Sequence, residues 1–286
     1  MAGDPFWEFE RDGWDRAAPH YVECWGDTDQ FVAPLLDGAR VGAGTRLLDV
    51  ACGPGIVSEA AAAHGADPVG LDVAPAMVEE ARKRLPGLTF VEGDAQQLPF
   101  GDGSFDAVTI NFGILHLSKP EVALAEARRV LVAEGRIAFT AWVAEGNAVE
   151  EIVGAAIARH AVPVELPEGP PFYRFADAEE SRRALAEAGF APDSVRLETV
   201  NAFWRLPRAD LLFEATLKAG VRRGAILRGQ PPERLEAIRT AMIEGVRRYA
   251  DGDDFALPIV ARVTSARADG DEFLAASRSK ERSESW

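Results

Sequence analysis

Four polar side chains lie at or next to the carboxyl ends of predicted strands, where they are placed to hold a small ligand. Asp49 falls in the apolar run 47–50, Asp72 ends a second strand, Asp94 follows a third and Asn111 follows a fourth. The carboxyl ends of parallel strands meet at one edge of a sheet, so these groups are expected to face one crevice. An acidic residue at the end of the second strand typically accepts hydrogen bonds from ribose hydroxyls.

A glycine turn separates the first strand from the helix that follows it. Gly53 and Gly55 bound this turn, and an Ala-rich helix is predicted from about residue 56 to residue 64. Glycine lets the backbone approach a ligand closely because it has no Cβ and tolerates positive φ. The first N–H groups of the helix point at the same place. A tight turn that binds nothing explains the glycines equally well by themselves, and the acidic strand ends are what favour a ligand.

Five segments in this order resemble the motifs of class I S-adenosylmethionine-dependent methyltransferases. Among these, they are most similar to the ubiquinone/menaquinone C-methyltransferase-like group. The segments are 47–55, 71–77, 92–100, 105–111 and 129–137. The resemblance covers roughly residues 40–145 and fades outside them. Five ordered motifs are a specific signal, whereas a Gly-x-Gly alone is not.

The resemblance implies S-adenosylmethionine as the cofactor. By motif position, the cofactor-binding residues are Asp49, Ala51, Gly53, Gly55, Asp72, Val73, Met77, Asp94, Ala95 and Asn111. Asp72 would bind the ribose and Asp94 with Ala95 the adenine edge, while Asn111 would lie near the methionine part. Taken singly, Asp72 is as well explained as a helix N-cap, Asp94 as a turn residue and Met77 as core.

A nicotinamide dehydrogenase is the alternative for the same strand, turn and helix. Its fingerprint needs a third Gly or Ala three residues after the second Gly, and that position is Ser58 here. Asp49 and Asp94 have no counterpart in that fingerprint. These mismatches disfavour the dehydrogenase.

Composition limits the partners. The 46 acidic and 31 basic side chains give a net charge of −15, which argues against nucleic acid because nucleic-acid binders neutralise phosphates. Two cysteines provide no disulfide framework, and the chain shows neither a leader segment nor an apolar run long enough to span a membrane. A small-molecule substrate and a cytoplasmic location are expected, and the oligomeric state stays open.

Alternating strands and helices between residues 40 and 145 require parallel strands. The predicted fold is α/β: a doubly wound, mostly parallel, Rossmann-like seven-stranded sheet in three layers (α/β/α), with an N-terminal helical lid and an inserted helical cap. The predicted parts are a lid at 1–40, a core at 41–200 plus 253–272, a cap of two helices at 201–252 and a disordered tail at 273–286.

His116 is the one histidine expected at the edge of the site, just past the fourth strand. It is a candidate general base for an O–H or acidic C–H nucleophile, since the unperturbed pKa of histidine lies near neutrality. A packing or hydrogen-bonding role is the alternative. Four scattered histidines without Cys or Glu at ligand spacing predict no metal site.

Aromatic side chains at loop edges and on the N-terminal helix suggest an apolar or aromatic acceptor. The candidate substrate-binding residues are Tyr21, Trp25, Trp142, Phe172 and Trp204. Each is also explained by packing alone. An excess of arginines in the cap is a weak indication of an anionic group on the substrate, and a solvated helix face is the alternative.

The predicted function is methyl transfer to a small, apolar or aromatic metabolite by direct in-line displacement, on carbon or oxygen. One alternative is a cofactor-dependent cyclisation or rearrangement of a small substrate, such as a diphosphate or carboxylate, coupled to methylation. A second alternative is a protein that senses the cofactor without catalysis.

Overall fold

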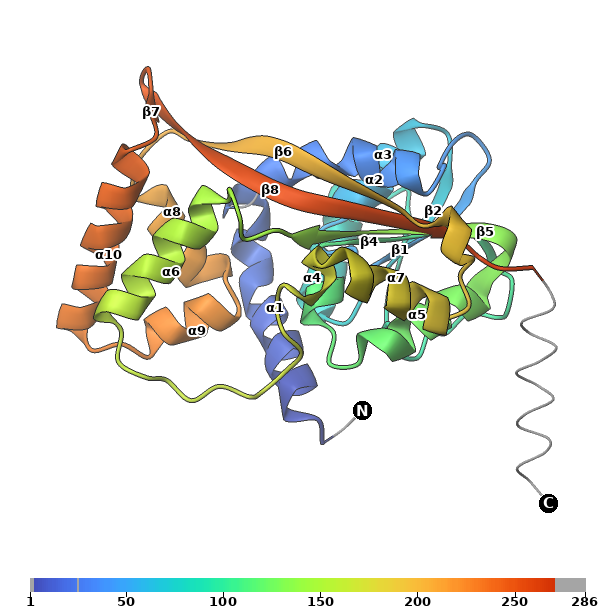
Figure 1. Cartoon of the computed structure of the whole chain (residues 1–286), viewed down its shortest axis with the longest axis horizontal. Coiled ribbons are helices and arrows are strands. Elements are labelled where there is room, and N and C mark those ends of the chain that lie inside the picture. The colour runs from blue at the N-terminus through green and yellow to red at the C-terminus, as the bar shows by residue number, and fades with distance from the viewer. Residues whose placement is uncertain (1–2, 25, 271–286) are drawn as a thin grey trace.

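The computed structural model of the chain describes residues 3–24 and 26–270. Its centre is an eight-stranded sheet with the strand order β3-β2-β1-β4-β5-β8-β6, and the short β7 lies off this path and pairs with β8 (Figure 1). The strands are β1 Arg46–Val50, β2 Asp67–Asp72, β3 Thr89–Glu92, β4 Phe105–Asn111, β5 Leu131–Trp142, β6 Arg196–Leu206, β7 Ala250–Asp251 and β8 Asp254–Arg267. The predicted sheet is confirmed, with the short β7 as one strand more than the seven expected. Trp25 and the predicted tail at 273–286 lie outside the described residues.

Strands β1 to β5 are parallel, and β8 runs antiparallel to both β5 and β6. The parallel register places Asp49 beside Gly70 on one side and beside Thr109 on the other. Since β1 and β4 are central and nearly fully buried, their carboxyl ends open at the same edge of the sheet. The order of the strands therefore brings the polar strand ends together as predicted.

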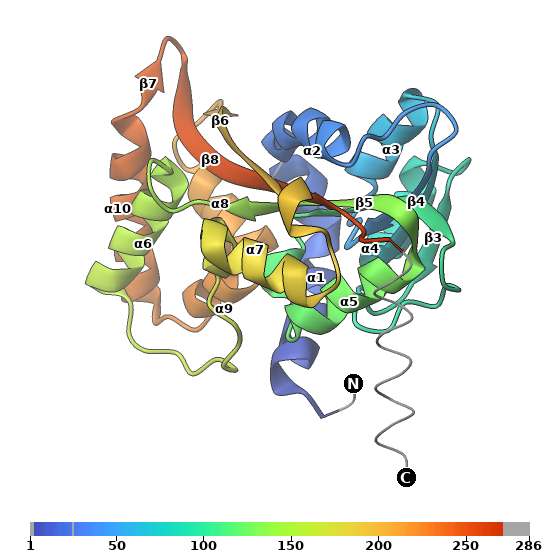
Figure 2. The same ribbon diagram turned by 45° about the vertical axis from the view of Figure 1, so that its right-hand side comes forward.

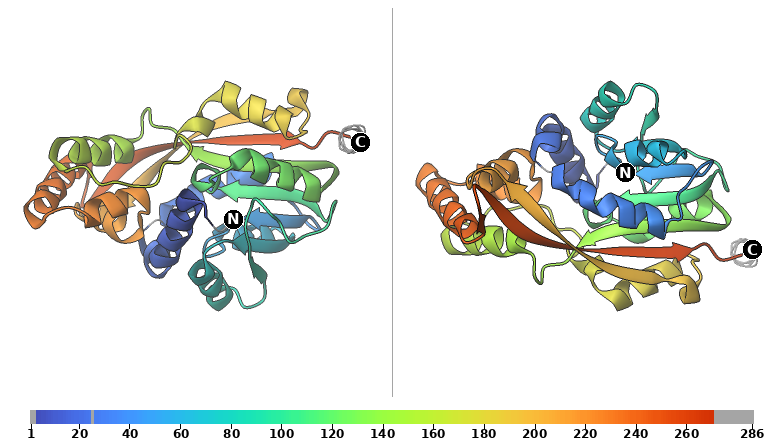
Figure 3. Two further views of the ribbon diagram at one scale, coloured as in Figure 1. Left: turned by 90° about the horizontal axis from the view of Figure 1, so that it is seen from below. Right: turned by 90° about the horizontal axis from the view of Figure 1, so that it is seen from above.

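Helices cover both faces of the sheet and make the three layers visible in Figure 3. On one face, Leu35 of α2 and Val57 of α3 pack against Leu47 of β1. On the other face, Leu124 of α5 and Leu185 of α7 pack with strand residues such as Phe139. The helices of this core are α2 Val32–Gly38, α3 Ile56–Ala63, α4 Pro75–Arg84, α5 Pro120–Val130 and α7 Ala178–Glu187. None of the described helices is both long enough and apolar enough to cross a membrane.

The inserted segment carries three helices where two were predicted. They are α8 Leu211–Ala219, α9 Arg222–Arg228 and α10 Pro232–Arg247. Helix α10 packs against α6 Ala148–His160 and against α8, and α8 packs against α9 (Figure 1). Residues 201–206, predicted as part of the cap, continue strand β6 instead. Leu206, Leu257 and Met242 are fully buried in the resulting second core, so β6 and β8 connect the sheet to the cap (Figures 1 and 2).

The N-terminal segment forms α1 Pro5–Cys24 and a short 3-10 helix, η1 Gly26–Phe31. Helix α1 contacts α4 of the core and α8 of the cap. A Cβ at Gly13 would lie 2.3 Å from Val221 Cγ1, so α1 approaches the cap too closely for any larger residue at this position. Figure 3 shows α1 lying across the side of the molecule where core and cap meet. Helix α1 therefore bridges the core and the cap, and its role as a lid stays a prediction.

Candidate active site

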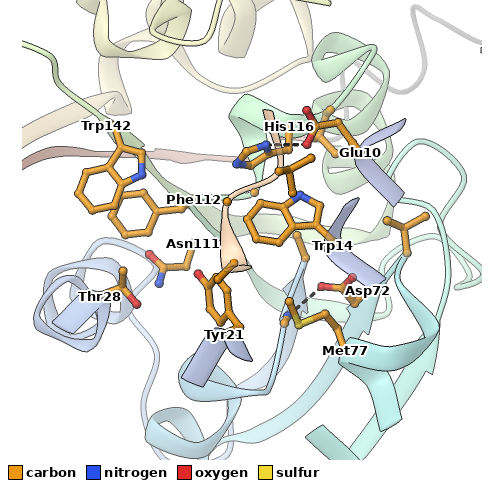
Figure 4. A pocket seen from close by; sticks show the side chains of 18 of the residues that line it. Glu10, Trp14, Tyr21, Thr28, Asp72, Met77, Asn111, Phe112, His116 and Trp142 are labelled. Carbon is orange, nitrogen blue, oxygen red and sulfur yellow. Dashed lines mark hydrogen bonds and ion pairs between the residues drawn. The ribbon is translucent and has the colours of Figure 1, made fainter. Parts of the chain in front are cut away.

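A cavity of about 400 Å³ begins at the carboxyl ends of β1, β2 and β4 and continues beneath α1 and the cap. Of the predicted site residues, it brings together His116 with Asp49, Ala51, Gly53, Asp72, Val73, Met77, Asp94, Ala95, Asn111, Tyr21, Trp142, Phe172 and Trp204. Gly55 is not among its lining residues, and Trp25 lies outside the described part of the chain. Figure 4 shows the side chains converging on this space.

The two turn glycines have different roles. Both adopt positive φ, 52° at Gly53 and 85° at Gly55. A Cβ at Gly53 would meet nothing closer than Met77 Sδ at 4.0 Å, so its backbone is open to the cavity. A Cβ at Gly55 would lie 2.9 Å from Leu85 and from Phe90, so Gly55 allows close packing of the turn against α4 and β3.

Asp72 holds the turn in place from the end of β2. One carboxylate oxygen accepts from Gly53 N at 2.8 Å and the other from Ala74 N at 2.9 Å. Burial raises the pKa of Asp72, and these backbone donors act in the opposite direction. The carboxylate also lines the cavity. Each of its oxygens keeps a second lone pair, so it can still accept a hydrogen bond from a ligand hydroxyl. Asp94 is less buried and forms a turn, accepting from Gln96 N at 2.8 Å.

Asp49 lies behind this turn and is completely buried. Its oxygens accept from Ser58 Oγ at 2.7 Å and from Thr109 Oγ1 at 3.3 Å. Burial raises the pKa of Asp49 to about 7, the two hydroxyl donors oppose this rise, and the negative charge of Asp72 adds to it. Ser58, which stands where a dehydrogenase has its third glycine, is therefore used to hold Asp49.

The end of β4 presents an unsatisfied oxygen. Asn111 Oδ1 is buried and has no hydrogen-bond partner among the described residues. The neighbouring Phe112 has φ of 54°, as does Ala51 at the end of β1. Left-handed backbone at residues other than glycine costs about 1–3 kcal/mol and is concentrated at functional sites. Both strained residues line the cavity.

These groups fit S-adenosylmethionine. Asp49, Asp72 and Asp94 make one end of the cavity acidic, which suits a ligand that carries a sulfonium and an ammonium group and would repel the pyrophosphate of a dinucleotide. The unpaired oxygen of Asn111 fits an ammonium donor. Gly53 leaves room for a ligand against the backbone.

The other end of the cavity is aromatic. Phe112 and Trp142 stack with ring centroids 4.0 Å apart and an interplanar angle of 21° (Figure 4). Phe31 packs edge-on against both, at 5.3 Å and 5.6 Å. Trp204 of β6 is buried and also lines the cavity. Phe112 was not predicted as a site residue. The only local sign of its place in the site was its position directly after Asn111, at the end of a strand.

Tyr21 of α1 faces the acidic end of the cavity (Figure 4). The pKa of Tyr21 is raised to about 12, mainly by burial and also by the charge of Asp72, while a hydrogen bond with Thr28 acts in the opposite direction. Trp14 packs edge-on against Tyr21 with centroids 5.7 Å apart. The tyrosine is therefore a neutral hydroxyl and not a base.

His116 is paired with a residue that sequence reasoning missed. Its Nδ1 lies 2.9 Å from Glu10 Oε2, and the side chains are 19% and 4% exposed. Glu10 belongs to α1, whereas His116 ends η2 Ile114–His116 beyond β4. Nothing in the sequence around Glu10 indicates this pair, because the carboxylate lies within a helix of ordinary amphipathic pattern.

The two cap arginines that line the cavity, Arg222 and Arg223, already have partners, which weakens the case for an anionic substrate. Arg223 forms an ion pair with Glu150 and donates to Tyr173 Oη at 3.2 Å. Arg222 donates to the carbonyl of Pro167 at 3.0 Å. Across residues 3–24 and 26–270, no three His, Cys, Asp or Glu side chains come close enough together to hold a metal ion.

The fold and the acidic crevice agree with the resemblance to the class I S-adenosylmethionine-dependent methyltransferases. Residues 48–139 match the family described as the methyltransferase domain. The demethylmenaquinone methyltransferase of Renibacterium salmoninarum is 41% identical over 128 residues, which are 43% of this chain and 54% of that protein. The demethylmenaquinone methyltransferase of Beutenbergia cavernae is 46% identical over 102 residues, 36% of this chain and 42% of that protein. The chain thus spans about half the length of the curated relatives it matches.

A solved structure shares the fold beyond this segment. It is Haemonchus contortus phosphoethanolamine N-methyltransferase 2 in complex with phosphomonomethylethanolamine and S-adenosylhomocysteine. Its TM-score is 0.55 at 18% identity, and the match covers 91% of this chain and 60% of that chain.

Proposed function

We propose that this chain transfers the methyl group of S-adenosylmethionine to a small aromatic acceptor of the hydroquinone class. The observation that carries the proposal is a single cavity with an acidic, glycine-bounded end and an aromatic, roofed end. The names of the curated relatives support a quinone-type acceptor. The net charge of −15 supports a small molecule over nucleic acid.

Residues of the acidic end would hold the cofactor. Asp72 would accept from the ribose hydroxyls, Asp94 and Ala95 would border the adenine, and Asn111 would accept from the ammonium group. Bound S-adenosylmethionine supplies a methyl group on positively charged sulfur. The protein then has mainly to align an acceptor with that methyl group, and such alignment contributes about 7–11 kcal/mol.

Residues of the aromatic end would orient the acceptor and exclude water. An aromatic ring gains about 0.5–1.5 kcal/mol from stacking or edge contacts beyond its buried area. The exposed edges of the Phe112–Trp142 stack offer such contacts inside the cavity. We infer that helix α1 and the cap helices open to admit the acceptor and close over it.

Calorimetry and a methyl-transfer assay test this proposal. The purified chain is expected to bind S-adenosylhomocysteine, and to move a labelled methyl group from S-adenosylmethionine to 1,4-dihydroxynaphthalene under anaerobic conditions. The product should carry the methyl group on ring carbon, which NMR distinguishes from a methyl ether. Absence of S-adenosylhomocysteine binding at millimolar concentration would refute the function, and a methyl ether would refute the carbon acceptor.

A further inference from the structure

We propose that Glu10 and His116 act as a general-base pair that removes a hydroxyl proton from the acceptor. His116 is the catalytic residue in this scheme because it would touch the acceptor, and Glu10 is a positioning residue. The inference rests on the proposed methyl transfer and names the property that its acceptor must have, namely an ionisable hydroxyl group.

The surroundings hold the imidazole ring of His116 in one orientation. Trp14 of α1 packs edge-on against it at a centroid distance of 4.8 Å, and Phe172 packs edge-on at 5.8 Å. Glu10 Oε2 meets its Nδ1 at 2.9 Å. A ring fixed by three neighbours cannot turn its other nitrogen away from the cavity that it lines (Figure 4).

The partner of Nδ1 determines which nitrogen is basic. An ionised carboxylate only accepts hydrogen bonds, so Nδ1 carries the proton in the neutral ring. Nε2 then keeps its lone pair, and this is the nitrogen that faces the acceptor end of the cavity. The same logic makes a carboxylate-bound histidine the base of hydrolytic triads.

One carboxylate oxygen of Glu10 lacks a hydrogen-bond donor among the described residues. This oxygen, Oε1, is buried. Leaving a buried polar atom unpaired costs about 1–3 kcal/mol, and more for a charged group. The hydrogen bond with His116 Nδ1 is therefore the more important to this carboxylate, and Glu10 holds the imidazole ring through it.

The chemistry balances without a further reactant. The acceptor's hydroxyl proton moves to Nε2, and the O–H electron pair increases the electron density of the acceptor ring. A ring carbon forms the bond to the methyl carbon while the carbon–sulfur bond breaks, with its electron pair left on sulfur. The proton at the attacked carbon then moves to the oxygen, which restores the aromatic ring and the hydroxyl and leaves one proton on His116 for each methyl group transferred. The imidazolium formed faces the carboxylate of Glu10, which stabilises it until its proton passes to water.

The base also depends on the lid. Glu10 comes from α1 and His116 from the core, and α1 contacts the core helix α4 and the cap helix α8. The contact that covers the cavity is therefore the same contact that orients the imidazole. Proton removal would begin only when α1 lies on the core, which keeps the acceptor neutral until water is excluded.

The first test measures the tautomer and needs no substrate. The chain has four histidines, so long-range proton–nitrogen NMR spectra are simple, and His116→Gln assigns the His116 signals. The proposal expects the wild-type ring to be protonated on Nδ1 and unprotonated on Nε2 near neutral pH. A ring protonated on Nε2 would overturn it.

The second test measures kcat with 1,4-dihydroxynaphthalene. His116→Gln should lower kcat by about 10²–10⁴-fold, the usual contribution of general-base catalysis. Glu10→Gln should lower kcat at least about tenfold, because it removes the charge that orients and stabilises the imidazolium. Glu8→Gln changes an exposed carboxylate of the same helix and should leave kcat unchanged. S-adenosylhomocysteine affinity should be the same in all three variants.

A more acidic acceptor separates proton removal from a structural role. A fluorinated 1,4-dihydroxynaphthalene has more acidic hydroxyls, so the loss in Glu10→Gln and His116→Gln should be smaller with it than with the parent compound. An equal loss with both acceptors, or full kcat in His116→Gln, would overturn the pair as a base. If the wild-type chain methylates neither acceptor, the proposed function is refuted. The tautomer measurement would then still show whether Glu10 orients the imidazole of His116 as proposed.

Discussion

Replacing Asp72 with alanine tests the cofactor end of the site most directly. The carboxylate is 7% exposed, and it accepts from Gly53 N at 2.8 Å and from Ala74 N at 2.9 Å. The alanine variant loses the charged acceptor for the ribose and also releases the backbone of the glycine turn. Both changes weaken binding of the cofactor.

The expected size of the effect follows from hydrogen bonds to a charged group. Such a bond contributes about 1.5–3 kcal/mol, which corresponds to a loss of affinity of about 10- to 150-fold. Each backbone N–H left buried without a partner also lowers the free energy of unfolding by about 1–3 kcal/mol. The stability loss is therefore part of the same prediction.

Calorimetry with S-adenosylhomocysteine at 25 °C gives the affinity, and urea unfolding followed by circular dichroism gives the stability. Asp67→Ala is the matched control, because Asp67 is exposed at the opposite end of the same strand, β2. This control should bind like the wild type. If folded Asp72→Ala protein binds S-adenosylhomocysteine with wild-type affinity, the assignment of the ribose site is incorrect.

Three further predictions concern the residues around this site. Burial raises the pKa of Asp49 to about 7. Between about pH 4 and pH 7 the folded chain therefore keeps a proton on this group that the unfolded chain has lost. The contribution of Asp49 to the free energy of unfolding declines as pH rises through this range. Asp49→Asn should flatten that decline in urea unfolding curves, and an equally steep decline would contradict the cause. Gly113→Ala would place a Cβ 2.5 Å from Ala51 Cβ and should lower the free energy of unfolding by about 1–3 kcal/mol, whereas Gly101→Ala, whose nearest contact is 3.6 Å, should not. Trp142→Leu should raise the KM for the acceptor by about 2- to 12-fold, because an aromatic contact is lost. The affinity for S-adenosylhomocysteine should not change. An unchanged KM would show that the acceptor does not bind at Trp142.

Local patterns predicted most helix boundaries correctly. The patterns Asn147-x-x-Glu150 and Asp177-x-x-Glu180 predict N-caps, and each side-chain oxygen accepts from two backbone N–H groups of the helix that follows. The pattern Ser118-x-x-Glu121 also predicts an N-cap, and this prediction is wrong, because Ser118 Oγ donates to Gln96 Oε1 and α5 begins at Pro120. Ser118 was misread because a tertiary partner competed for the hydroxyl.

The end of α5 shows the limit of helix signals. The segment from Glu121 to Ala133 predicts one helix that Gly135 closes, but α5 ends at Val130 and β5 begins at Leu131. Pairing with β4 at Phe105 decides this boundary, since Leu131 is its partner in the sheet. A strand that forms only beside another strand cannot be recognised from its own residues. The same reason explains why β6 runs six residues beyond its predicted end, into the segment assigned to the cap.

What the sequence alone determined is the chemistry of the strand ends: glycines in the first turn, carboxylates at Asp49, Asp72 and Asp94, and an amide at Asn111. Strand order then makes them neighbours, because parallel strands share one edge. Only the tertiary structure decided the acceptor end, where Glu10 reaches His116 across 106 positions of chain and Phe112 stacks on Trp142. Backbone hydrogen bonding and periodic burial leave a trace in neighbouring residues, whereas contacts between distant segments depend on how whole helices pack.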